Sequence, residues 1–326
     1  MYDRPAGKSR IELLDLARGV ALVAMAVYHF AWDLEFFGYA EPGMTAVGGW
    51  KLFARCIASS FLFIVGFSLY LAHSAGIRPR SYLRRLAMVA GAALAISLVT
   101  WFAVPGGFIF FGILHQIALA SVLGLLFLRL PWFVSAATAV FFVAAPWYLR
   151  STMFDAPVLW WIGLSSSDPV SNDYVPLFPW FGAVLAGIAA ANLATGVGLM
   201  ERLRFSMGRW SSPFRFLGRH SLIVYLVHQP LLIALVWILS QVAPPALRSD
   251  ADQFGLACEA TCTQTHDADF CARYCDCVYD RLAAAGALDA VFASEQDAEQ
   301  IAMLNETASM CTFNAGQDLG EAGTTE

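Results

Sequence analysis

Seven apolar stretches, each close to twenty residues long, fill the first three quarters of the sequence. A helix that spans a bilayer needs about 20 such residues, because every backbone hydrogen bond must be made inside the segment. The whole chain is 58% hydrophobic and 14% charged, with a mean hydropathy of +0.59, which excludes an ordinary soluble globular domain. We therefore expect an all-α integral membrane protein, a bundle of about seven spans at 12–36, 50–73, 84–104, 108–128, 132–149, 177–194 and 217–241.

The composition changes near Pro244. Residues 1–249 hold 18 Lys and Arg against 10 Asp and Glu, whereas residues 250–326 hold 2 against 15. This contrast predicts two domains, a transmembrane domain at 1–247 and a small acidic, α-helical tail domain outside the membrane at 248–326. The expected partner of the transmembrane domain is the lipid bilayer, and no nucleic-acid partner is expected.

Basic residues in the connections predict the orientation. Arginines crowd the second and sixth connections, while those at 38–49, 104–108 and 150–176 hold one basic residue between them. Under the positive-inside rule the N-terminus and the arginine-rich connections are cytoplasmic. Seven crossings then place the tail outside, which for a bacterial chain means a multi-pass inner-membrane protein with a periplasmic tail.

Cysteine usage supports the same side for the tail. An even set of six in a small acidic segment is typical of disulfides in an oxidising compartment. On a helix, a C-x3-C spacing puts both sulfurs on one face, so a helix with Cys258 and Cys262 could be joined face to face to a helix with Cys271 and Cys275. This arrangement would leave Cys277 to pair with Cys311, and it is one choice among the fifteen pairings that six cysteines allow. A metal site that includes His266 is the alternative. The six are Cys258, Cys262, Cys271, Cys275, Cys277 and Cys311, and the seventh, Cys56, is expected to be a small buried side chain.

The first apolar stretch carries four ionisable residues: Asp15, Arg18, His29 and Asp33. Such groups in a spanning helix are costly unless they face protein or a polar cavity, so they indicate function. At 100° per residue, Arg18 and His29 return to within ~20° of one face and lie ~16 Å apart along the axis. Asp15 and Asp33 lie three and four residues from Arg18 and His29, at spacings where helical side chains meet. The four therefore predict a polar seam that faces the interior.

Two later spans carry further candidates. His115 is expected about two turns deep in the fourth span, near the predicted level of His29, which would allow the two to share a site. The last span carries Arg219 at its cytoplasmic end and His228 near mid-membrane, just before Pro230. Because proline frees a backbone carbonyl and kinks the helix, His228 is expected to line a cavity.

These stretches resemble a known family. The R-x10-H spacing of Arg18 and His29 is similar to the first helix of the transmembrane acyltransferase superfamily. The runs ELLDLARG, HFAWDLEFFG, GILHQIAL and PWFG resemble the bacterial branch related to heparan-α-glucosaminide N-acetyltransferase, and LGRHSLIVYLVHQPLL resembles the closing helix of the wider superfamily. The eukaryotic enzyme is usually described with its catalytic histidine in the luminal loop after the first helix, whereas residues 38–50 here contain no histidine.

The resemblance implies an acyltransferase that moves an acyl group, most simply acetyl, from cytoplasmic acetyl-CoA to an amine or hydroxyl of an extracytoplasmic sugar or glycan. Arg18, Arg219 and His228 are then expected to bind the donor. His29 is the expected base, Asp33 its orienting carboxylate, and His115 an acid for the leaving thiolate or a polariser of the carbonyl. No metal is expected, and a homo-oligomer is left open.

Two other functions stay open. Intramembrane Asp, Arg and His are also typical of a proton-coupled transporter or exporter. Many transporters contain repeated halves, and no convincing self-similarity relates the first three spans to the last four. A scaffold that displays the tail is the third reading.

The long connection 150–176 is rich in aromatic residues. These residues could cover an acceptor site, or they could anchor the connection at the level of the lipid headgroups, where Trp and Tyr are common.

Overall fold

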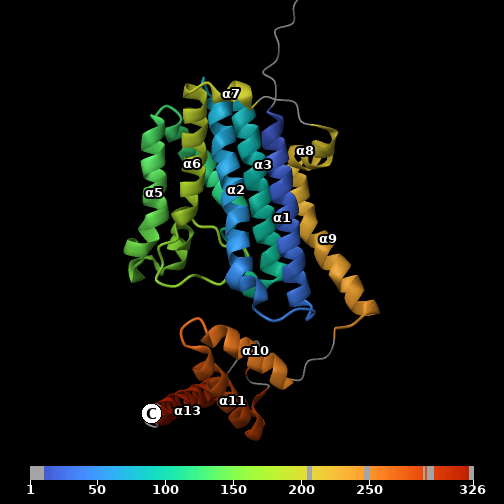
Figure 1. The fold of residues 1–326 in the computed structure, drawn as a ribbon, viewed down its shortest axis with the longest axis vertical. Coiled ribbons are helices and arrows are strands. Elements are labelled where there is room, and N and C mark those ends of the chain that lie inside the picture. The colour runs from blue at the N-terminus through green and yellow to red at the C-terminus, as the bar shows by residue number, and fades with distance from the viewer. Residues whose placement is uncertain (1–10, 204–207, 246–249, 289–290, 292–296, 323–326) are drawn as a thin grey trace, which may run out of the picture. The chain divides into compact units, whose positions relative to one another are not determined.

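The computed structural model describes the chain except residues 1–10, 204–207, 246–249, 289–290, 292–296 and 323–326 (Figure 1). The described residues form two compact units. The first contains the chain up to His29 together with Leu52–Leu231, and the second contains Phe30–Lys51 and the chain from Leu232 onward. Helices predominate in both units, and no strand occurs among the described residues.

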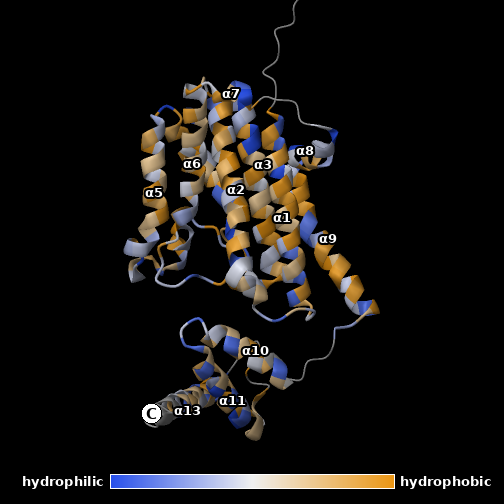
Figure 2. Cartoon of the chain, viewed as in Figure 1, coloured by the Kyte–Doolittle hydropathy of each residue, from blue (hydrophilic) through white to orange (hydrophobic). Residues whose placement is uncertain are grey.

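Six helices of the described chain are long and apolar enough to cross a membrane, so the all-α membrane fold is confirmed (Figure 2). Many large apolar side chains on them are exposed, including Phe102, Val140 and Trp147, as expected of surfaces in contact with lipid. The six are α1 (Glu12–Phe36), α2 (Gly48–His73), α3 (Pro79–Ala103), α5 (Trp132–Leu149), α6 (Leu177–Gly196) and α9 (Ser221–Val242).

The fourth predicted span is shorter than expected. Helix α4 (Ile113–Leu123) begins late, because Pro105–Gly107 forms a separate 3-10 turn and Gly112 is extended. After Leu123 the chain continues only as a 3-10 turn, Gly124–Phe127. The seventh predicted span is also divided. A short amphipathic helix, α8 (Ser212–Arg219), ends before α9 begins, and a single-turn helix, α7 (Leu199–Arg202), precedes it.

Glycines set the closest helix contacts of the first unit. A Cβ on Gly66 of α2 would lie 1.9 Å from the Val184 oxygen of α6, and one on Gly187 of α6 would lie 2.1 Å from the Phe63 oxygen of α2. Small residues allow helix backbones to approach this closely in membranes. Around this contact lie fully buried side chains of α6, Val184, Leu185 and Ile188.

A second reciprocal glycine contact joins the first helix to α8. A Cβ on Gly19 would lie 1.9 Å from the Phe214 oxygen, and one on Gly218 would lie 1.8 Å from the Asp15 oxygen. Both helices therefore need glycine at the crossing. This crossing lies at the end of α1 that carries Asp15 and Arg18.

The second unit contains the cysteine-rich helices α10 (Asp250–Cys262), α11 (Ala268–Ala284) and α13 (Ala298–Ala322). Its small apolar core holds Phe254, Val278 and Leu282 beside a disulfide sulfur. The predicted stapling of two helices, with the last two cysteines paired, is confirmed by bonds between Cys258 and Cys275, Cys262 and Cys271, and Cys277 and Cys311.

One expectation about a single residue was wrong. Cys56 is exposed on α2 rather than buried, because the neighbouring turn, which includes Leu52 and Arg55, is exposed as well. The alternative metal site with His266 is not formed: the cysteines are in disulfides, and the His266 ring stacks on Phe270 with centroids 4.6 Å apart. Within the described ranges no three His, Cys, Asp or Glu side chains gather as metal ligands.

Candidate functional site

The polar seam of α1 faces the interior, as predicted. Asp15 and Asp33 are 1% and 0% exposed, and Leu22 and Met25, which lie on the same stripe, are also buried. Burying carboxylates is costly unless they are paired or hydrogen-bonded, so their positions indicate specific surroundings rather than chance. Asp33 follows His29 by one turn of α1, and its role toward that imidazole stays a prediction.

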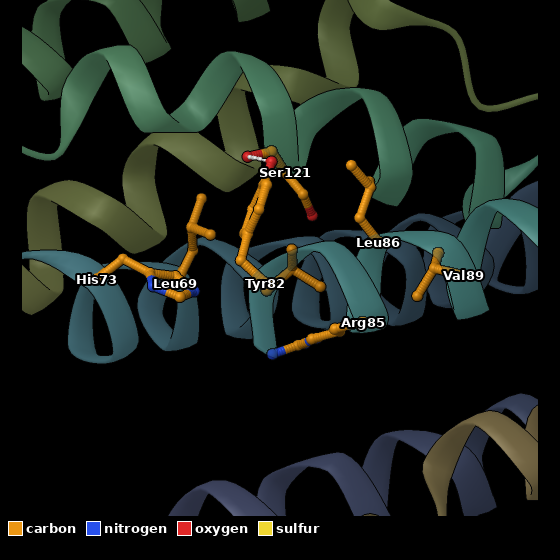
Figure 3. Close-up of a pocket in the computed structure, with 8 residues that line it drawn as sticks. Leu69, His73, Tyr82, Arg85, Leu86, Val89 and Ser121 are labelled. Carbon is orange, nitrogen blue, oxygen red and sulfur yellow. Dashed lines mark hydrogen bonds between the residues drawn. The ribbon is translucent and has the colours of Figure 1, made fainter. Parts of the chain in front are cut away.

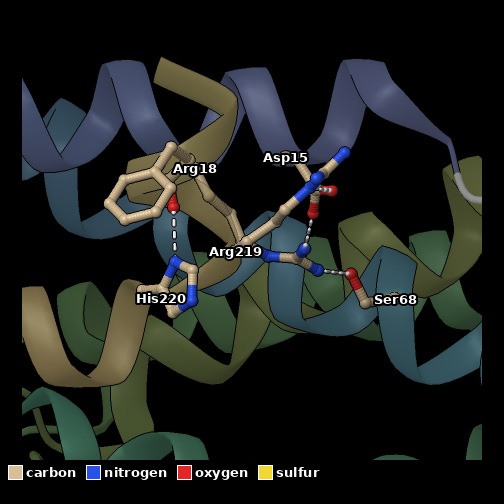
Figure 4. A network of polar contacts seen from close by, with 6 residues as sticks. Asp15, Arg18, Ser68, Arg219 and His220 are labelled. Atoms are coloured by element: carbon tan, nitrogen blue, oxygen red, sulfur yellow. Dashed lines mark hydrogen bonds and ion pairs between the residues drawn. The ribbon is translucent and has the colours of Figure 1, made fainter. Parts of the chain in front are cut away.

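Asp15 joins two arginines at one end of the first unit (Figure 4). Arg18 donates through Nη1 to Asp15 Oδ1 at 3.2 Å and through Nη2 to the Ser68 hydroxyl at 2.5 Å. Arg219 approaches the other carboxylate oxygen of Asp15 through Nε, at 3.4 Å. Arg18 and Arg219, which the sequence placed in one donor-binding set, are therefore brought together.

This arginine site carries a net positive charge. One carboxylate, Asp15, faces two guanidinium groups, and the next acidic residue along the helix, Glu12, forms an ion pair with Arg215. The Arg219 side chain is 46% exposed, whereas Asp15 and Arg18 are largely buried. Asp15 orients the Arg219 guanidinium through Nε, and the exposed part of that guanidinium can meet an anion at the protein surface.

The second feature is a pair of histidines. The His29 ring on α1 lies beside the His228 ring on α9, with centroids 5.1 Å apart. His228 Nδ1 lies 2.6 Å from the Tyr225 carbonyl oxygen, and a carbonyl only accepts, so Nδ1 carries the hydrogen. In the neutral ring Nε2 then has the lone pair, and this buried atom has no hydrogen-bond partner among the described residues. The pair thus contains a nitrogen whose lone pair is not used within the described residues.

Tyr225 extends this site toward the connection before α6. Its ring lies 5.7 Å from that of His228, and its hydroxyl donates to Asp173 Oδ2 at 3.5 Å. The same oxygen accepts the backbone N–H of Ile113, the first residue of α4, at 2.9 Å. Burial raises the pKa of the Asp173 carboxyl above its ordinary value of 3.8, although the Ile113 N–H opposes this effect.

Tyr225 and Asp173 were missed from the sequence as site residues. The signal for Tyr225 was present, because it lies three residues before His228 in the run YLVHQ. No local pattern distinguishes Asp173 from Asp155 and Asp168 in the same connection. Only the folded chain shows that Asp173 caps α4.

His115 has different surroundings from the His29 and His228 pair. Its Nδ1 accepts the Gly112 backbone N–H at 3.1 Å, so its Nε2 carries the hydrogen and donates to the Ser97 hydroxyl at 3.1 Å. Ser97 in turn donates to the Ile109 carbonyl at 2.6 Å. The two ring nitrogens therefore connect the beginning of α4 to the Gly112 backbone before it and to Ser97 of α3. The partner of His29 is His228, not the His115 that the predicted depths suggested.

The connection 150–176 is folded against the residues just before α4. Tyr174 donates to the Trp160 carbonyl at 2.7 Å, and the Trp160 indole donates to the Asp155 carbonyl at 2.9 Å. The Phe110 ring packs on the rings of Trp160 and Tyr174, with centroid distances of 5.6 and 5.7 Å. The Ser165 hydroxyl, with that of Ser166, lowers the pKa of the Asp155 carboxyl, whereas burial raises the pKa of Tyr174 to about 12.

Comparison with known proteins gives one match. A family model described as "Heparan-alpha-glucosaminide N-acetyltransferase, catalytic" matches residues 10–230. That range includes the arginine site, both members of the histidine pair, Tyr225 and Asp173. Neither the curated proteins nor the solved structures give a match.

Proposed function

Since this chain belongs to the heparan-α-glucosaminide N-acetyltransferase catalytic family, we propose that it is a multi-pass membrane acetyltransferase that uses acetyl-CoA as donor and a sugar outside the membrane as acceptor. The observation that carries this proposal is the arrangement of two polar sites on one helix. Arg18 and His29 are eleven residues apart on α1, which is ~16 Å along the axis. A long thioester donor has its charge at one end and its reactive carbonyl at the other.

The arginine site is the proposed anchor for that charge. Arg219 is exposed enough to meet a phosphate, and Asp15 holds it beside Arg18. Guanidinium groups form paired hydrogen bonds to phosphate oxygens, which gives orientation as well as affinity. The positive-inside rule supports placing this end in the cytoplasm, where acetyl-CoA is made. The three disulfides of the tail are typical of an oxidising compartment, which supports an inner-membrane location with the tail domain 248–326 in the periplasm.

The histidine pair is the proposed proton acceptor. The nitrogen of an acceptor amine attacks the thioester carbonyl carbon, and the His228 Nε2 lone pair or its His29 neighbour takes the proton that the amine loses. The C–S bond then breaks, and the imidazolium returns the proton to the departing thiolate. The products are an N-acetyl sugar and the free thiol of coenzyme A, and the histidines are restored.

Supporting residues differ in their proposed roles. The Tyr225 carbonyl accepts from His228 Nδ1–H, so it would stabilise the imidazolium while the proton is held. Asp33 is proposed to orient His29 from the next turn. We place proton transfer on His29 and His228 rather than on His115, because both nitrogens of His115 already make structural hydrogen bonds. The folded connection 150–176 is the proposed cover of the acceptor side.

The test is transfer across a sealed membrane. Purified protein is reconstituted in liposomes with labelled acetyl-CoA inside or outside, and glucosamine oligomers are supplied on the opposite side. We expect label on the sugar amine only when the donor faces the arginine site, with release of one thiol for each acetyl group. If the folded protein moves no label in either arrangement but acidifies the lumen under a proton gradient, the transporter alternative is supported instead.

A further inference from the structure

A narrow groove between α2, α3 and α4 lies apart from both sites described above (Figure 3). Four of its lining residues are apolar and four are polar, and none comes from α1 or α9. The apolar residues are Val65, Leu69, Leu86 and Val89, and the polar residues are His73, Tyr82, Arg85 and Ser121.

The two kinds of residue are separated along the membrane normal. On α2, Val65, Leu69 and His73 follow one another at four-residue intervals on one face, with His73 at the helix end. On α3, Tyr82 and Arg85 lie in the first two turns and Val89 lies deeper. The groove therefore runs from apolar depth to a polar mouth, beside the exposed cations Arg78, Arg80 and Arg84.

His73 at the mouth is a buried group with bonding capacity to spare. It is 9% exposed, and its Nδ1 has no hydrogen-bond partner among the residues described. The Tyr82 ring packs edge-on against the His73 ring, with centroids 5.4 Å apart, but the Tyr82 hydroxyl donates its hydrogen bond to the Ser121 carbonyl at 3.2 Å. A buried polar atom of this kind is costly unless a ligand meets it.

The size of the groove restricts the ligand. Its interior is about 20 Å³, which is room for a single oxygen atom rather than for a whole headgroup. A ligand therefore inserts one oxygen beside His73 and Arg85, while the rest of it lies outside the groove. That is the form of an amphiphile with an anionic phosphate at one end.

We propose that this groove binds a phosphate oxygen of an anionic phospholipid, whose acyl chains lie in the bilayer outside the groove. Basic pockets between spanning helices at the cytoplasmic side are known to hold such headgroups. The donor of the acetyl reaction is a soluble source of the same phosphate chemistry, but it has to reach His29 and His228, and the groove contains no residue of the two helices that carry them. The lipid site and the proposed acetyl transfer are independent, so either can fail alone.

The test measures lipid affinity of the full-length protein in a neutral detergent. Dioleoyl phosphatidylglycerol is expected to bind and to raise the midpoint of thermal unfolding, whereas dioleoyl phosphatidylcholine is not. Arg85→Gln should weaken phosphatidylglycerol binding about tenfold or more, since it removes a charged hydrogen-bond donor. Arg84→Gln is the matched control, because Arg84 is in the same turn and is exposed, as Arg85 is, but does not line the groove.

Two further arms keep the result decisive. Arg85→Lys retains the charge and is expected to keep most of the affinity, which excludes general misfolding as the cause of the loss. Adenosine 3′,5′-bisphosphate supplies phosphate without an acyl chain, and any shift of the unfolding midpoint that it causes through the arginine site is expected to be the same in wild type and Arg85→Gln. Equal binding of both lipids, equal loss in the Arg84 and Arg85 variants, or a bisphosphate response that Arg85→Gln abolishes would each overturn the proposal.

Discussion

His29 and His228 come from the first and last helices of the membrane region, and their imidazole rings lie 5.1 Å apart. Side chains this close share one local environment, so a proton that arrives at one ring changes the energy of a proton on the other. The proposed chemistry depends on the pair rather than on either residue alone.

Replacing His228 with Gln, or His29 with Gln, is expected to lower kcat for acetyl transfer by about 10²–10⁴, the usual contribution of a general base. Because the two act as a unit, the double variant should lose little more than the worse single variant. The measurement is single-turnover transfer in detergent. His220→Gln is the matched control, since His220 is exposed at the C-cap of α8 and its ring Nδ1 bonds the Phe216 carbonyl. Fully multiplicative losses would contradict the shared role.

Replacing His115 with Ala is expected to destabilise the protein more than it slows catalysis. The substitution leaves the Gly112 N–H and the Ser97 hydroxyl without an imidazole partner, and a buried group so deprived costs about 1–3 kcal/mol. A lower midpoint of thermal unfolding, with kcat of the folded fraction within a few-fold of wild type, is the expected result. A loss of kcat above a hundredfold at unchanged stability would restore His115 as a catalytic acid.

The Asp173 carboxyl predicts a pH dependence of stability. Burial raises its pKa in the folded protein above 3.8, so the folded state holds this proton more tightly than the unfolded state does. Its contribution is therefore most favourable below the unfolded pKa and is lost as pH rises through the folded pKa. Asp173→Asn keeps an oxygen that accepts from Ile113 N–H but cannot ionise. Unfolding midpoints measured upward from pH 4 should fall in wild type relative to the variant, and parallel curves would contradict this.

The crossing of α1 and α8 predicts a large effect of one methyl group. In Gly218→Ala the new Cβ would lie 1.8 Å from the Asp15 carbonyl oxygen, so the helices must separate. Overpacking of this kind costs about 1–3 kcal/mol or more, and Arg219 would also move away from Asp15. Gly91→Ala on α3 is the control, because nothing lies within 4 Å of its added Cβ. Thermal unfolding of both variants should show a loss only for the first.

The tail predicts a defined count of reactive thiols. One cysteine of seven, Cys56, is free, so alkylation of the unfolded protein without reductant should add one label, and alkylation after reduction should add seven. In the chain-entropy view the Cys277–Cys311 bond, with a sequence separation of 34, stabilises by about 4 kcal/mol, and the Cys262–Cys271 bond, with a separation of 9, by about 2–3 kcal/mol. Paired Ser substitutions should follow that order in urea unfolding. Seven labels without reductant would contradict the disulfides.

Much of the fold could be predicted from the sequence, because spans and disulfides leave local patterns. Hydropathy over twenty residues identified the long helices, and the C-x3-C spacing identified the faces of α10 and α11 that meet. The fourth span could not be delimited in this way. Its beginning is set by Asp173, which accepts the Ile113 N–H from sixty positions away, and hydropathy does not register such a cap.

The candidate site could be predicted in part. Arg18 and His29 were identifiable because ionisable residues in an apolar helix are rare, and Arg219 because it lies at the predicted end of a span. The pairing of His29 could not be predicted, since depth in the membrane does not say which helices are neighbours. The sequence suggested His115 at a similar depth, whereas interhelical packing brings His228 to His29 and leaves His115 with Ser97.

The contact between Asp15 and Arg219 also has a consequence for biosynthesis. The two residues are 204 positions apart, so at 5–20 residues per second roughly 10–40 s pass between the synthesis of one and of the other. During that interval α1 has been made but Gly218, against which it packs, has not. Helix α1 can pack on α2 early, but it meets α8 late, so the arginine site is assembled only when translation of the membrane region is nearly complete.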